Sequence, residues 1–552
     1  MRHIAAALLF AVSSQSQQSA QLQPLAAPPP LVEKIDVSVV NVDVTVTDRR
    51  GETVPGLTRN DFEIFEDGKP QPISNFYAVE NAQARTDTQP ASGDAPAPAP
   101  ERFRRKVLVL VDNLNSTARG RNNALEKLET FIKDHFDDGG YDWSIAIIDS
   151  RVHLVLPMTS NKKVLHDVVA EIRRTPSRKE MKATITTADF ARSTDVGVNP
   201  APLLDQQQAE DRVSNFREES NLAEQMMFAT SSTGAIVQAA RAFGTTEGRK
   251  IILLVTGQLP LGHVSPIDRI GGDNSSKLGN HIQSLTSSNR ELSNLREQLV
   301  HEANASNTSF YIIAADGLEV PEQEAIGKNF GAPPARSNAA DTSSMYWLAN
   351  ETGGAYMPGN RMDQSFVEFD RRSATFYSLG YITQHPDDSR YHRLTVRVKG
   401  HSEYRLQYRD GYSSAPTDIQ MTRTLRSPLG ATMQPSTLAV TLIVGEPQYR
   451  GLIALVPIKA AMAMESLQYI TDARGSRTRL HVYVSIFDRD GRNVTLAKSF
   501  ADIAVQPNES ATGPMTVTIP PLALAKGTYR VVVAVRDELT DHVGLVSQKI
   551  DI

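Results

Sequence analysis

The feature that most constrains the fold is an alternation of short apolar runs with amphipathic helical runs between residues 106 and 384. The first run, Val107–Val111, is continuously apolar, which is typical of a strand covered by helices on both faces. Apolar side chains of the next segment fall on one helical face, and strand-like runs return at 143–148, 250–255 and 309–315. We therefore predict an α/β fold with a doubly wound, mostly parallel sheet over residues 104–384.

Two stretches of this α/β segment are polar and too long for ordinary connections. They lie near residues 176–225 and 260–300. We interpret them as insertions, partly helical or looped. Because loops on a rigid sheet often carry recognition, we expect binding specificity in these insertions.

The flanking regions follow a period of two, which is typical of half-buried strands. Valines 40, 42, 44 and 46 alternate with polar residues, and Asp67-Gly68 favours a tight hairpin turn, so residues 31–80 are predicted to form a small β module. Residues 81–103 are rich in Pro and Ala and indicate a linker.

Further strand patterns lie after the α/β segment. Residues 385–412 predict a β hairpin that packs with the N-terminal module, and residues 436–552 carry short strands with turn punctuation, the pattern of a β-sandwich. A segment of 44–54 also matches 484–494 in register at Val, Asp, Arg, Gly and Val. Shared turn chemistry or a duplicated module would each produce this echo.

The N-terminus has the layout of a secretory signal, which we assign to residues 1–20. Arg2 and His3 precede an apolar run at 4–12, and a stretch rich in Ser and Gln follows. That run is too short to span a bilayer, and no later run is long enough, so no membrane span is expected in the mature chain. We therefore expect an exported protein, periplasmic or extracellular, of bacterial type.

Composition excludes several classes of function. Cysteine is absent, which removes disulfides, thiolate metal sites and cysteine nucleophiles. Lys plus Arg is 58 and Asp plus Glu is 63, a net charge of −5, so no bulk positive charge is available for nucleic acid. We expect an unidentified protein partner in the cell envelope or outside the cell.

One group of polar residues follows the first strand of the α/β segment. Asp112 and Ser116 would present oxygen atoms at the carboxyl end of that strand, where open parallel sheets bind ligands. Such oxygens suit Mg²⁺ or Mn²⁺. The alternative is that Asp112 and Asn115 only cap the helix that follows.

These residues resemble the start of the metal-ion-dependent adhesion site of von Willebrand factor type A domains, which reads Asp-x-Ser-x-Ser. Asp112 and Ser116 match its first and last positions, and Leu114 replaces the middle Ser. The family's Thr best matches Thr233, and Gly257 stands at the position of the family's second Asp. The resemblance thus implies a degenerate metal site of Asp112, Ser116 and Thr233, with no cofactor required or with Mg²⁺ or Mn²⁺ retained.

Other motifs extend the resemblance across residues 31–412. The chain is similar to the exported von Willebrand factor A-related proteins of Acidobacteria in the five motifs that follow. They are Val42-Asp-Val-Thr-Val-Thr-Asp with Val54-Pro-Gly-Leu, Asp61-Phe-Glu-Ile-Phe-Glu-Asp-Gly-Lys69, Leu348-Ala-Asn-Glu-Thr-Gly-Gly354, Arg393-Leu-Thr-Val-Arg-Val398 and Tyr408-Arg-Asp-Gly-Tyr412. The resemblance implies the fold, and the family is known mainly as a domain class.

The resemblance favours a non-enzymatic binding or scaffolding protein that contacts a partner through the type A domain. The phosphate-loop, dinucleotide, nucleophile-elbow and zinc-protease motifs are all absent from the sequence. A hydrolase site assembled across the fold is one alternative. Carbohydrate binding by the C-terminal sandwich is another, with Tyr483, Phe487 and Tyr529 as candidate aromatic platforms or as core residues.

Overall fold

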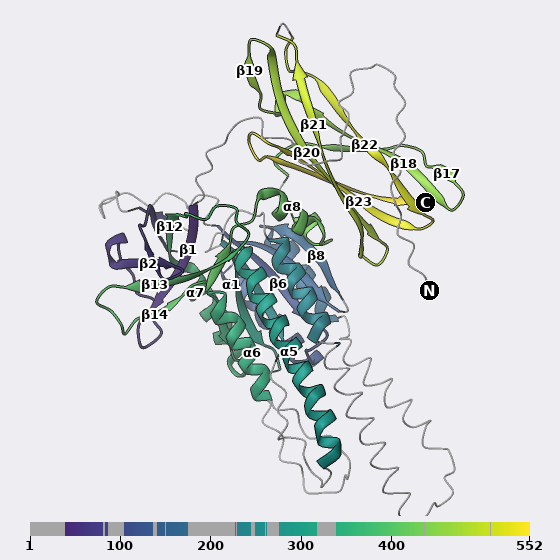
Figure 1. Cartoon of the computed structure of the whole chain (residues 1–552). Coiled ribbons are helices and arrows are strands. Elements are labelled where there is room, and N and C mark those ends of the chain that lie inside the picture. Colours follow the sequence, from purple (N-terminus) through teal and green to yellow (C-terminus); the bar gives the residue numbers. More distant parts are fainter. Residues whose placement is uncertain are drawn as a thin grey trace, which may run out of the picture. The chain divides into compact units, whose positions relative to one another are not determined.

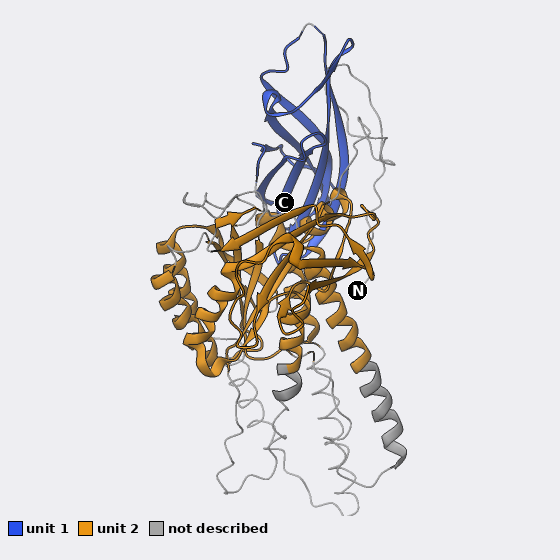
Figure 2. Ribbon diagram, turned by 90° about the vertical axis from the view of Figure 1, so that its left-hand side faces the viewer, with its two compact units in different colours: residues 1–34, 435–552 blue, residues 35–434 orange. Residues whose placement is uncertain are grey.

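The computed structural model describes two compact units, one within residues 35–434 and one within 435–552 (Figure 2). The predicted signal peptide at 1–20 and the predicted insertion at 176–225 lie outside the described residues. The described ranges are 39–80, 83–86, 104–135, 141–149, 151–174, 227, 229–243, 249–259, 261, 275–316, 338–433, 436–507 and 509–552.

A six-stranded sheet of the first unit has the strand order β11-β10-β9-β6-β7-β8. Figure 1 labels its strands β6 and β8. All neighbours are parallel except β7 and β8. This is the doubly wound order in which the first strand lies at the centre and the chain then moves outward to each side. The prediction of a mixed α/β fold is confirmed. The strands are β6 Arg105–Asp112, β7 Tyr141–Ile148, β8 Val152–Thr159, β9 Arg249–Thr256, β10 Thr308–Ala314 and β11 Ala355–Met357.

Helices cover both faces of this sheet, because successive side chains of a strand point to opposite faces. Leu108 and Leu110 of β6 belong to a core with α5, α6 and the helical residues 229–242. Val107, Val109 and Val111 belong to a second core with α1, α2 and α7. The helices are α1 Ala118–His135, α2 Lys162–Arg174, α5 Ser275–Ala305, α6 Asn338–Glu351 and α7 Met362–Ala374, preceded by the short η5 Gly359–Arg361.

The predicted insertion near 260–300 needs correction. Its second half belongs to α5, which runs on to Ala305 and packs on the sheet. Leu292, Leu299 and Val300 are buried there, and they recur at the spacing of one helical face. Polar residues lie between these apolar positions, so the average composition of the segment is polar although one face of the helix is apolar.

The N-terminal module is a two-layer β structure built from both sides of the α/β segment. One sheet has the order β14-β1-β12-β4-β5 and the other β15-β13-β2-β3. Valines of β1 share one buried cluster with Phe62, Tyr377 and Val396. The elements are β1 Val39–Thr47, η1 Arg59–Asp61, β2 Phe62–Glu66, β3 Lys69–Gln71, β4 Asn75–Glu80, β5 Gln83–Arg85, β12 Thr375–Ile382, β13 Tyr391–Val398, β14 Arg405–Gln407 and β15 Gly411–Ser413.

Three predicted boundaries differ from this arrangement. The predicted hairpin at 385–412 is not formed by its two main strands, because β13 pairs with β2 and with β15 while β14 pairs with β1. The segment 104–384 includes β12, which pairs with β1 and β4. The linker 81–103 begins with β5, which pairs with β4. In each case a strand outside the predicted segment, β1, β2 or β4, supplies the pairing.

The two segments of the sequence echo form turns with the same hydrogen bonds. Asp48 Oδ1 accepts from the backbone N–H groups of Arg50 and Glu52, and Asp488 Oδ1 accepts from those of Asp490 and Arg492. Each turn also contains a glycine with positive φ, Gly51 in the first and Gly491 in the second. The shared sequence therefore encodes a shared turn.

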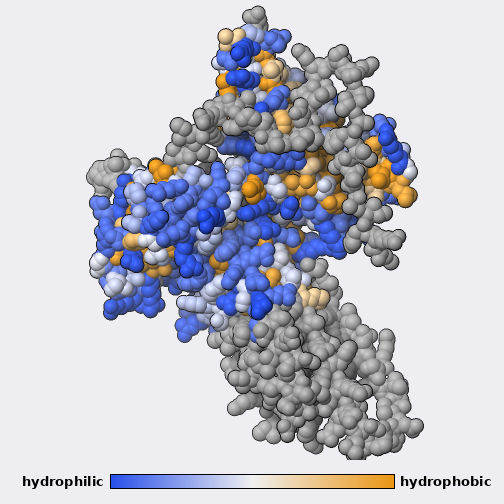
Figure 3. All heavy atoms as spheres, in the orientation of Figure 1, coloured by the Kyte–Doolittle hydropathy of each residue, from blue (hydrophilic) through white to orange (hydrophobic). Residues whose placement is uncertain are grey.

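The second unit consists of two antiparallel sheets whose inward side chains form one buried cluster. Tyr483 and Phe487 are buried, so they are core residues and not exposed platforms. Apolar side chains reach the surface near β17, where Tyr449 and Leu452 are exposed (Figure 3). The elements are β16 Thr441–Val444, β17 Gln448–Arg450, β18 Ile453–Ala463, η6 Met464–Ser466, β19 Ile470–Asp472, β20 Gly475–Asp488, β21 Asn493–Val505, β22 Pro514–Ala525, β23 Thr528–Asp537 and β24 Val543–Asp551.

Two short helices end the first unit, α8 Thr417–Leu425 and α9 Gly430–Met433. Within the described ranges, no helix combines the length and the apolar character that crossing a bilayer requires.

A truncation series tests how the N-terminal module is completed. A chain that ends at residue 384 lacks β13 and β14, so β2 keeps only β3 as a partner and the buried Phe62 and Ile64 lose the cover of β13. We expect proteolysis to cleave the module in this chain and a urea transition to be lost. The control chain ends at residue 434 and keeps every strand of the module, so it should resist cleavage as the full chain does. Equal resistance of both truncations would contradict the pairing.

A buried lysine gives a prediction about pH. Lys250 lies at the start of β9, where burial and the nearby Arg409 together lower its pKa to about 7 against an opposing effect of Asp43. The unfolded chain therefore binds more protons than the folded chain between pH 7 and the ordinary lysine pKa, so this residue makes the free energy of unfolding rise with pH there. We expect a rise of about 2 kcal/mol between pH 7 and 9.

The measurement is chemical denaturation across this pH range. Lys250→Met should be more stable than the wild type at pH 7 and should show a weaker dependence on pH. Lys69→Met, at an exposed lysine of β3, should keep the wild-type slope. An unchanged slope in Lys250→Met would refute the assignment.

Candidate functional site

The candidate site lies at the carboxyl edge of the central sheet, where Asp112 ends β6 and Thr256 ends β9. β6 is paired with β7 on one side and β9 on the other, so this edge is the switch point of the doubly wound sheet. Asp112 and Ser116 are fully buried, and Thr233 is 1% exposed. The structure therefore places the predicted residue Asp112 at the predicted edge.

Both oxygens of the Asp112 carboxylate are occupied by donors of the protein. Oδ1 accepts from the backbone N–H groups of Leu114 at 2.9 Å and Asn115 at 3.1 Å. Oδ2 lies 2.8 Å from Asn115 Nδ2 and 2.9 Å from Thr256 Oγ1. Burial raises the pKa of Asp112, and the hydrogen bonds from Asn115 and Thr256 work in the opposite direction.

The side-chain amide of Asn115 links the end of β6 to the helical residues 229–242. Asn115 Nδ2 donates to Asp112 Oδ2 and also lies 2.6 Å from Ser232 Oγ. Thr233 follows Ser232, and its Oγ1 is buried with no hydrogen-bond partner among the described residues. Ser116 Oγ accepts from the backbone N–H of Gly257 at 3.0 Å. Asn115 thus donates from its side-chain NH₂ group, whereas the capping alternative expects its side-chain oxygen to accept from the helix.

The donor set of this site does not fit a Mg²⁺ or Mn²⁺ ion. Such ions need free oxygen lone pairs around them. A carboxylate offers about four lone-pair sites, and those of Asp112 face N–H and O–H groups. Leu114 and Gly257 supply no side-chain oxygen. The position between Asp112 and Ser232 holds an amide NH₂ group, which is a hydrogen-bond donor.

A second carboxylate, Asp316, fills the space that Gly257 leaves open. It follows β10, the strand on the far side of β9. A Cβ atom on Gly257 would lie 2.1 Å from Asp316 Oδ2, and a Cβ on Gly120 would lie 2.2 Å from Asp316 Oδ1. The absence of side chains at Gly120 and Gly257 therefore leaves room for the Asp316 carboxylate. Asp316 occupies the space that an Asp side chain at position 257 would need.

Asp316 is held at the N-terminus of α1. Its Oδ1 accepts from Thr117 Oγ1 at 2.5 Å and from the backbone N–H of Thr117 at 3.0 Å. Thr117 Oγ1 in turn accepts from the backbone N–H of Gly120, which makes Thr117 the N-cap of α1. A negative charge is favoured at this end of a helix by the backbone dipoles. Asp316 therefore ties β10 to α1 across Gly257.

Sequence reasoning missed four residues of this site: Asn115 as a side-chain donor, Thr256, Ser232 and Asp316. A signal existed for Asp316, because it follows an apolar strand just as Asp112 does. Carboxyl ends of parallel strands share one edge, so acidic residues after neighbouring strands meet there. The approach of Asn115 and Ser232, which are far apart in sequence, carried no such signal.

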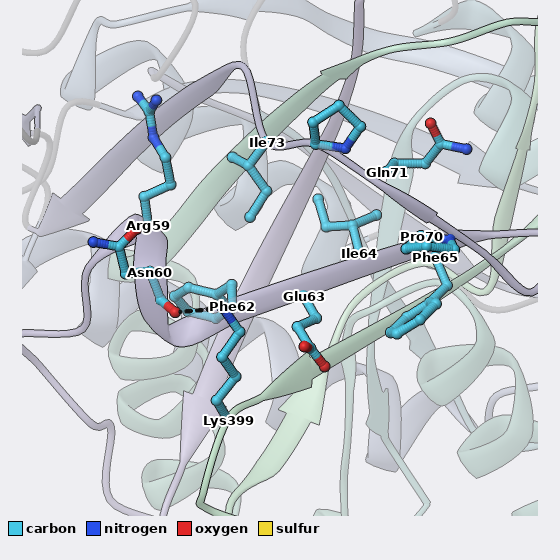
Figure 4. Close-up of a pocket in the computed structure, with 11 residues that line it drawn as sticks. Arg59, Asn60, Phe62, Glu63, Ile64, Phe65, Pro70, Gln71, Ile73 and Lys399 are labelled. Atoms are coloured by element: carbon cyan, nitrogen blue, oxygen red, sulfur yellow. Dashed lines mark hydrogen bonds between the residues drawn. The ribbon is translucent and has the colours of Figure 1, made fainter.

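A separate hollow lies on the N-terminal module, between β2, β3 and the residues around Lys399 (Figure 4). Ile64 and Ile73 line it, and Lys399 Nζ donates to the backbone oxygen of Asn60 at 2.9 Å. Its lining includes none of Asp112, Ser116 and Thr233. This hollow is therefore distinct from the site at the sheet edge.

The replacement of residue 257 by Asp316 can be tested with a double-mutant cycle. Gly257→Asp should destabilise the chain by roughly 1–3 kcal/mol, because the new side chain meets Asp316 and the backbone oxygen of Asn115. Asp316→Gly should cost about 1–3 kcal/mol through its lost hydrogen bonds. The double variant should be more stable than the sum of the two losses predicts.

Chemical denaturation measures all three variants. Gly234→Asp is the control, since no atom lies within 4 Å of a Cβ placed there, and it should change stability little. Strict additivity in the cycle would show that the two positions do not share one space.

Comparisons with protein-family models and with curated proteins give no match. Among solved structures, the chain is similar to an aerotolerance-related membrane protein from Bacteroides fragilis NCTC 9343 with multiple mutations to serines. The identity is 12% over 49% of this chain and 98% of that chain, with a TM-score of 0.24. The conserved hypothetical protein BatB from Bacteroides thetaiotaomicron is similar at 10% identity over 49% of this chain and 98% of its own, with a TM-score of 0.23.

Proximal thread matrix protein 1 from the mussel byssus is also similar. The identity is 10% over 49% of this chain and 48% of that protein, and the TM-score is 0.23. Because these identities and scores are low, the α/β architecture described above rests on the strand order and pairing of this chain.

Proposed function

We propose that this chain is a non-enzymatic binding or scaffolding protein of the cell envelope or exterior, whose α/β domain is of the von Willebrand factor A type. In this proposal the domain contacts a protein partner through the carboxyl edge of its sheet, without a metal ion. The observation that carries the proposal is the hydrogen-bonded closure of Asp112 by Asn115 and Thr256.

The strand order supports the choice of domain type. The sheet is doubly wound, its one antiparallel neighbour pair is at the β8 edge, and an aspartate ends the central strand β6. These features agree with the sequence motifs that resemble those of von Willebrand factor A domains. The antiparallel sheets of the second unit share one core, and we infer that they form a β-sandwich that braces or presents the domain.

The closed site supports contact through polar groups that are already in place. Asp112, Asn115 and Ser232 are held by one another, so the loop after β6 needs little ordering when a partner binds. Arg119 is exposed beside this loop, and Leu114 and Gln258 are half-buried. A partner would therefore contact the Arg119 cation and the short polar side chains around it, on a loop whose conformation is already fixed.

The same geometry supports a non-enzymatic role. A serine nucleophile needs a base within hydrogen-bond reach. Ser116 Oγ is bonded to the Gly257 N–H and Ser232 Oγ to the Asn115 amide. Over the described ranges, no histidine makes a hydrogen bond with either serine. Carbohydrate binding is less favoured, because Tyr483 and Phe487 are buried.

Site-specific photocrosslinking in cells tests the proposed contact. A photoreactive residue at Arg119 or at Gln258 should produce the same crosslinked species, identified by mass spectrometry. Treatment with EDTA should leave its yield unchanged. The control position is Glu171, an exposed residue near the end of α2, which should give no such species.

A thermal melt with EDTA and then with excess Mg²⁺ or Mn²⁺ separates the two parts of the proposal. We expect no rise in Tm, since an ion bound only to the folded chain would raise stability by RT ln(1 + [L]/Kd). A rise that disappears in Asp112→Ala would overturn the metal-free site. Equal crosslinking at Glu171 and Arg119 would overturn the contact surface.

A further inference from the structure

A cluster of ionisable side chains lies in the N-terminal module, away from the site at the sheet edge. Glu66 ends β2, Asp67 follows in the hairpin turn, and His392 lies on β13 beside them. His385 and Asp388 come from the segment that joins β12 to β13. Three separate segments thus bring two imidazoles and three carboxylates together, which are ligand types that Zn²⁺ accepts.

The ligand atoms of Glu66, His385 and His392 lie within 4.8 Å of one another. The side chain of Glu66 is 1% exposed and that of His392 is 6% exposed, whereas His385 is on the surface. Glu66 Oε1 lies 3.7 Å from His392 Nδ1. Ligands of a tetrahedral Zn²⁺ are roughly 3.3 Å apart, so this pair needs little movement. His385 can turn toward it because its side chain is exposed.

His392 is oriented as a metal-binding histidine would be. Its Nε2 lies 3.0 Å from Asp388 Oδ2, and its Nδ1 lies 2.8 Å from Asp67 Oδ2. A histidine that ligates a metal almost always donates its other ring N–H to a carboxylate or carbonyl. With Nε2–H donated to Asp388, Nδ1 faces Glu66 and Asp67, and an ion bound at Nδ1 would take the place of the proton that Nδ1 shares with Asp67.

The carboxylates of the cluster outnumber its cations. Glu66, Asp67 and Asp388 pair with His392, and within the described ranges no lysine or arginine forms an ion pair with any of them. Glu66 is instead fixed by hydroxyl groups, with Tyr412 donating to its Oε1 at 2.7 Å and Thr383 at 3.1 Å. A buried carboxylate in such surroundings favours a neighbouring cation.

We propose that Glu66, His385 and His392 bind a divalent transition-metal ion of the Zn²⁺ class, with Asp67 beside the ion and Asp388 orienting His392. The ion would join β2, β13 and the segment after β12. It is therefore a structural site that clamps the two halves of the module, which are separated in sequence by the α/β domain.

Calorimetric titration of the metal-stripped full chain with Zn²⁺ tests this proposal. We expect about one ion per chain, and Co²⁺ in its place should give the visible absorption of a tetrahedral site. His385→Ala should weaken Zn²⁺ binding by at least about tenfold, and Asp388→Asn by about 10- to 100-fold. Both changes affect side chains outside the buried core, and circular dichroism in EDTA should show an unchanged fold.

The matched control is His401→Ala. His401 also pairs with a carboxylate, Glu403, at 2.9 Å in the same module, but it is not part of the cluster. It should leave the affinity for Zn²⁺ unchanged. The proposal is overturned if the wild type binds no Zn²⁺, if His385→Ala binds it as tightly as the wild type, or if His401→Ala weakens binding equally. Binding of Ca²⁺ as tight as that of Zn²⁺ would also overturn it, since carboxylates alone would then hold the ion.

Discussion

The arrangement of the α/β domain depends on how two carboxylates are satisfied at the carboxyl edge of its sheet. Asp112 is fully buried, and an unsatisfied charge in that position would be strongly destabilising. The loop after β6 folds back so that its own N–H groups and the Asn115 amide reach Asp112. Asp316 bonds to Thr117 at the start of α1. These bonds set the positions of β6, β9, β10 and α1 relative to one another.

The absence of a side chain at Gly257 has a structural role as well as a chemical one. In the family's motif that position carries a carboxylate of its own, whereas here the neighbouring strand supplies one through the open space. The carboxylate faces the helix N-terminus and a threonine hydroxyl. The edge of the sheet is thus a hydrogen-bonded surface, which agrees with the contact proposed above.

The two candidate sites of the first unit differ in their balance of donors and acceptors. Around Asp112, N–H groups meet both carboxylate oxygens and the Thr256 hydroxyl meets one of them, so the donors disfavour a cation there. Around Glu66 and His392, carboxylates outnumber the cations that pair with them. The chain therefore disfavours a metal ion where the family resemblance implied one, and it favours one where the sequence contained no recognisable motif.

Much of the secondary structure could be predicted from local pattern. The continuous run at 107–111, the alternating valines of β1 and the Asp-Gly turn after Glu66 each reflect a preference that acts within a few residues. The same local pattern also predicted that Asp112 lies at the end of β6. The buried apolar face of α5 was not predicted, because most residues of this segment are polar. Leu292 and Leu299 nevertheless have the spacing of one helical face.

What the sequence alone determined is therefore many of the strands, several of the helices and the position of Asp112, because these depend on neighbours along the chain. Only the tertiary structure decided that β13 pairs with β2, that Asp316 occupies the space at Gly257, and that His392 meets Glu66. Each of these contacts joins residues that are far apart in sequence. Their energies come from packing, charge and hydrogen bonds in three dimensions, which no local periodicity records.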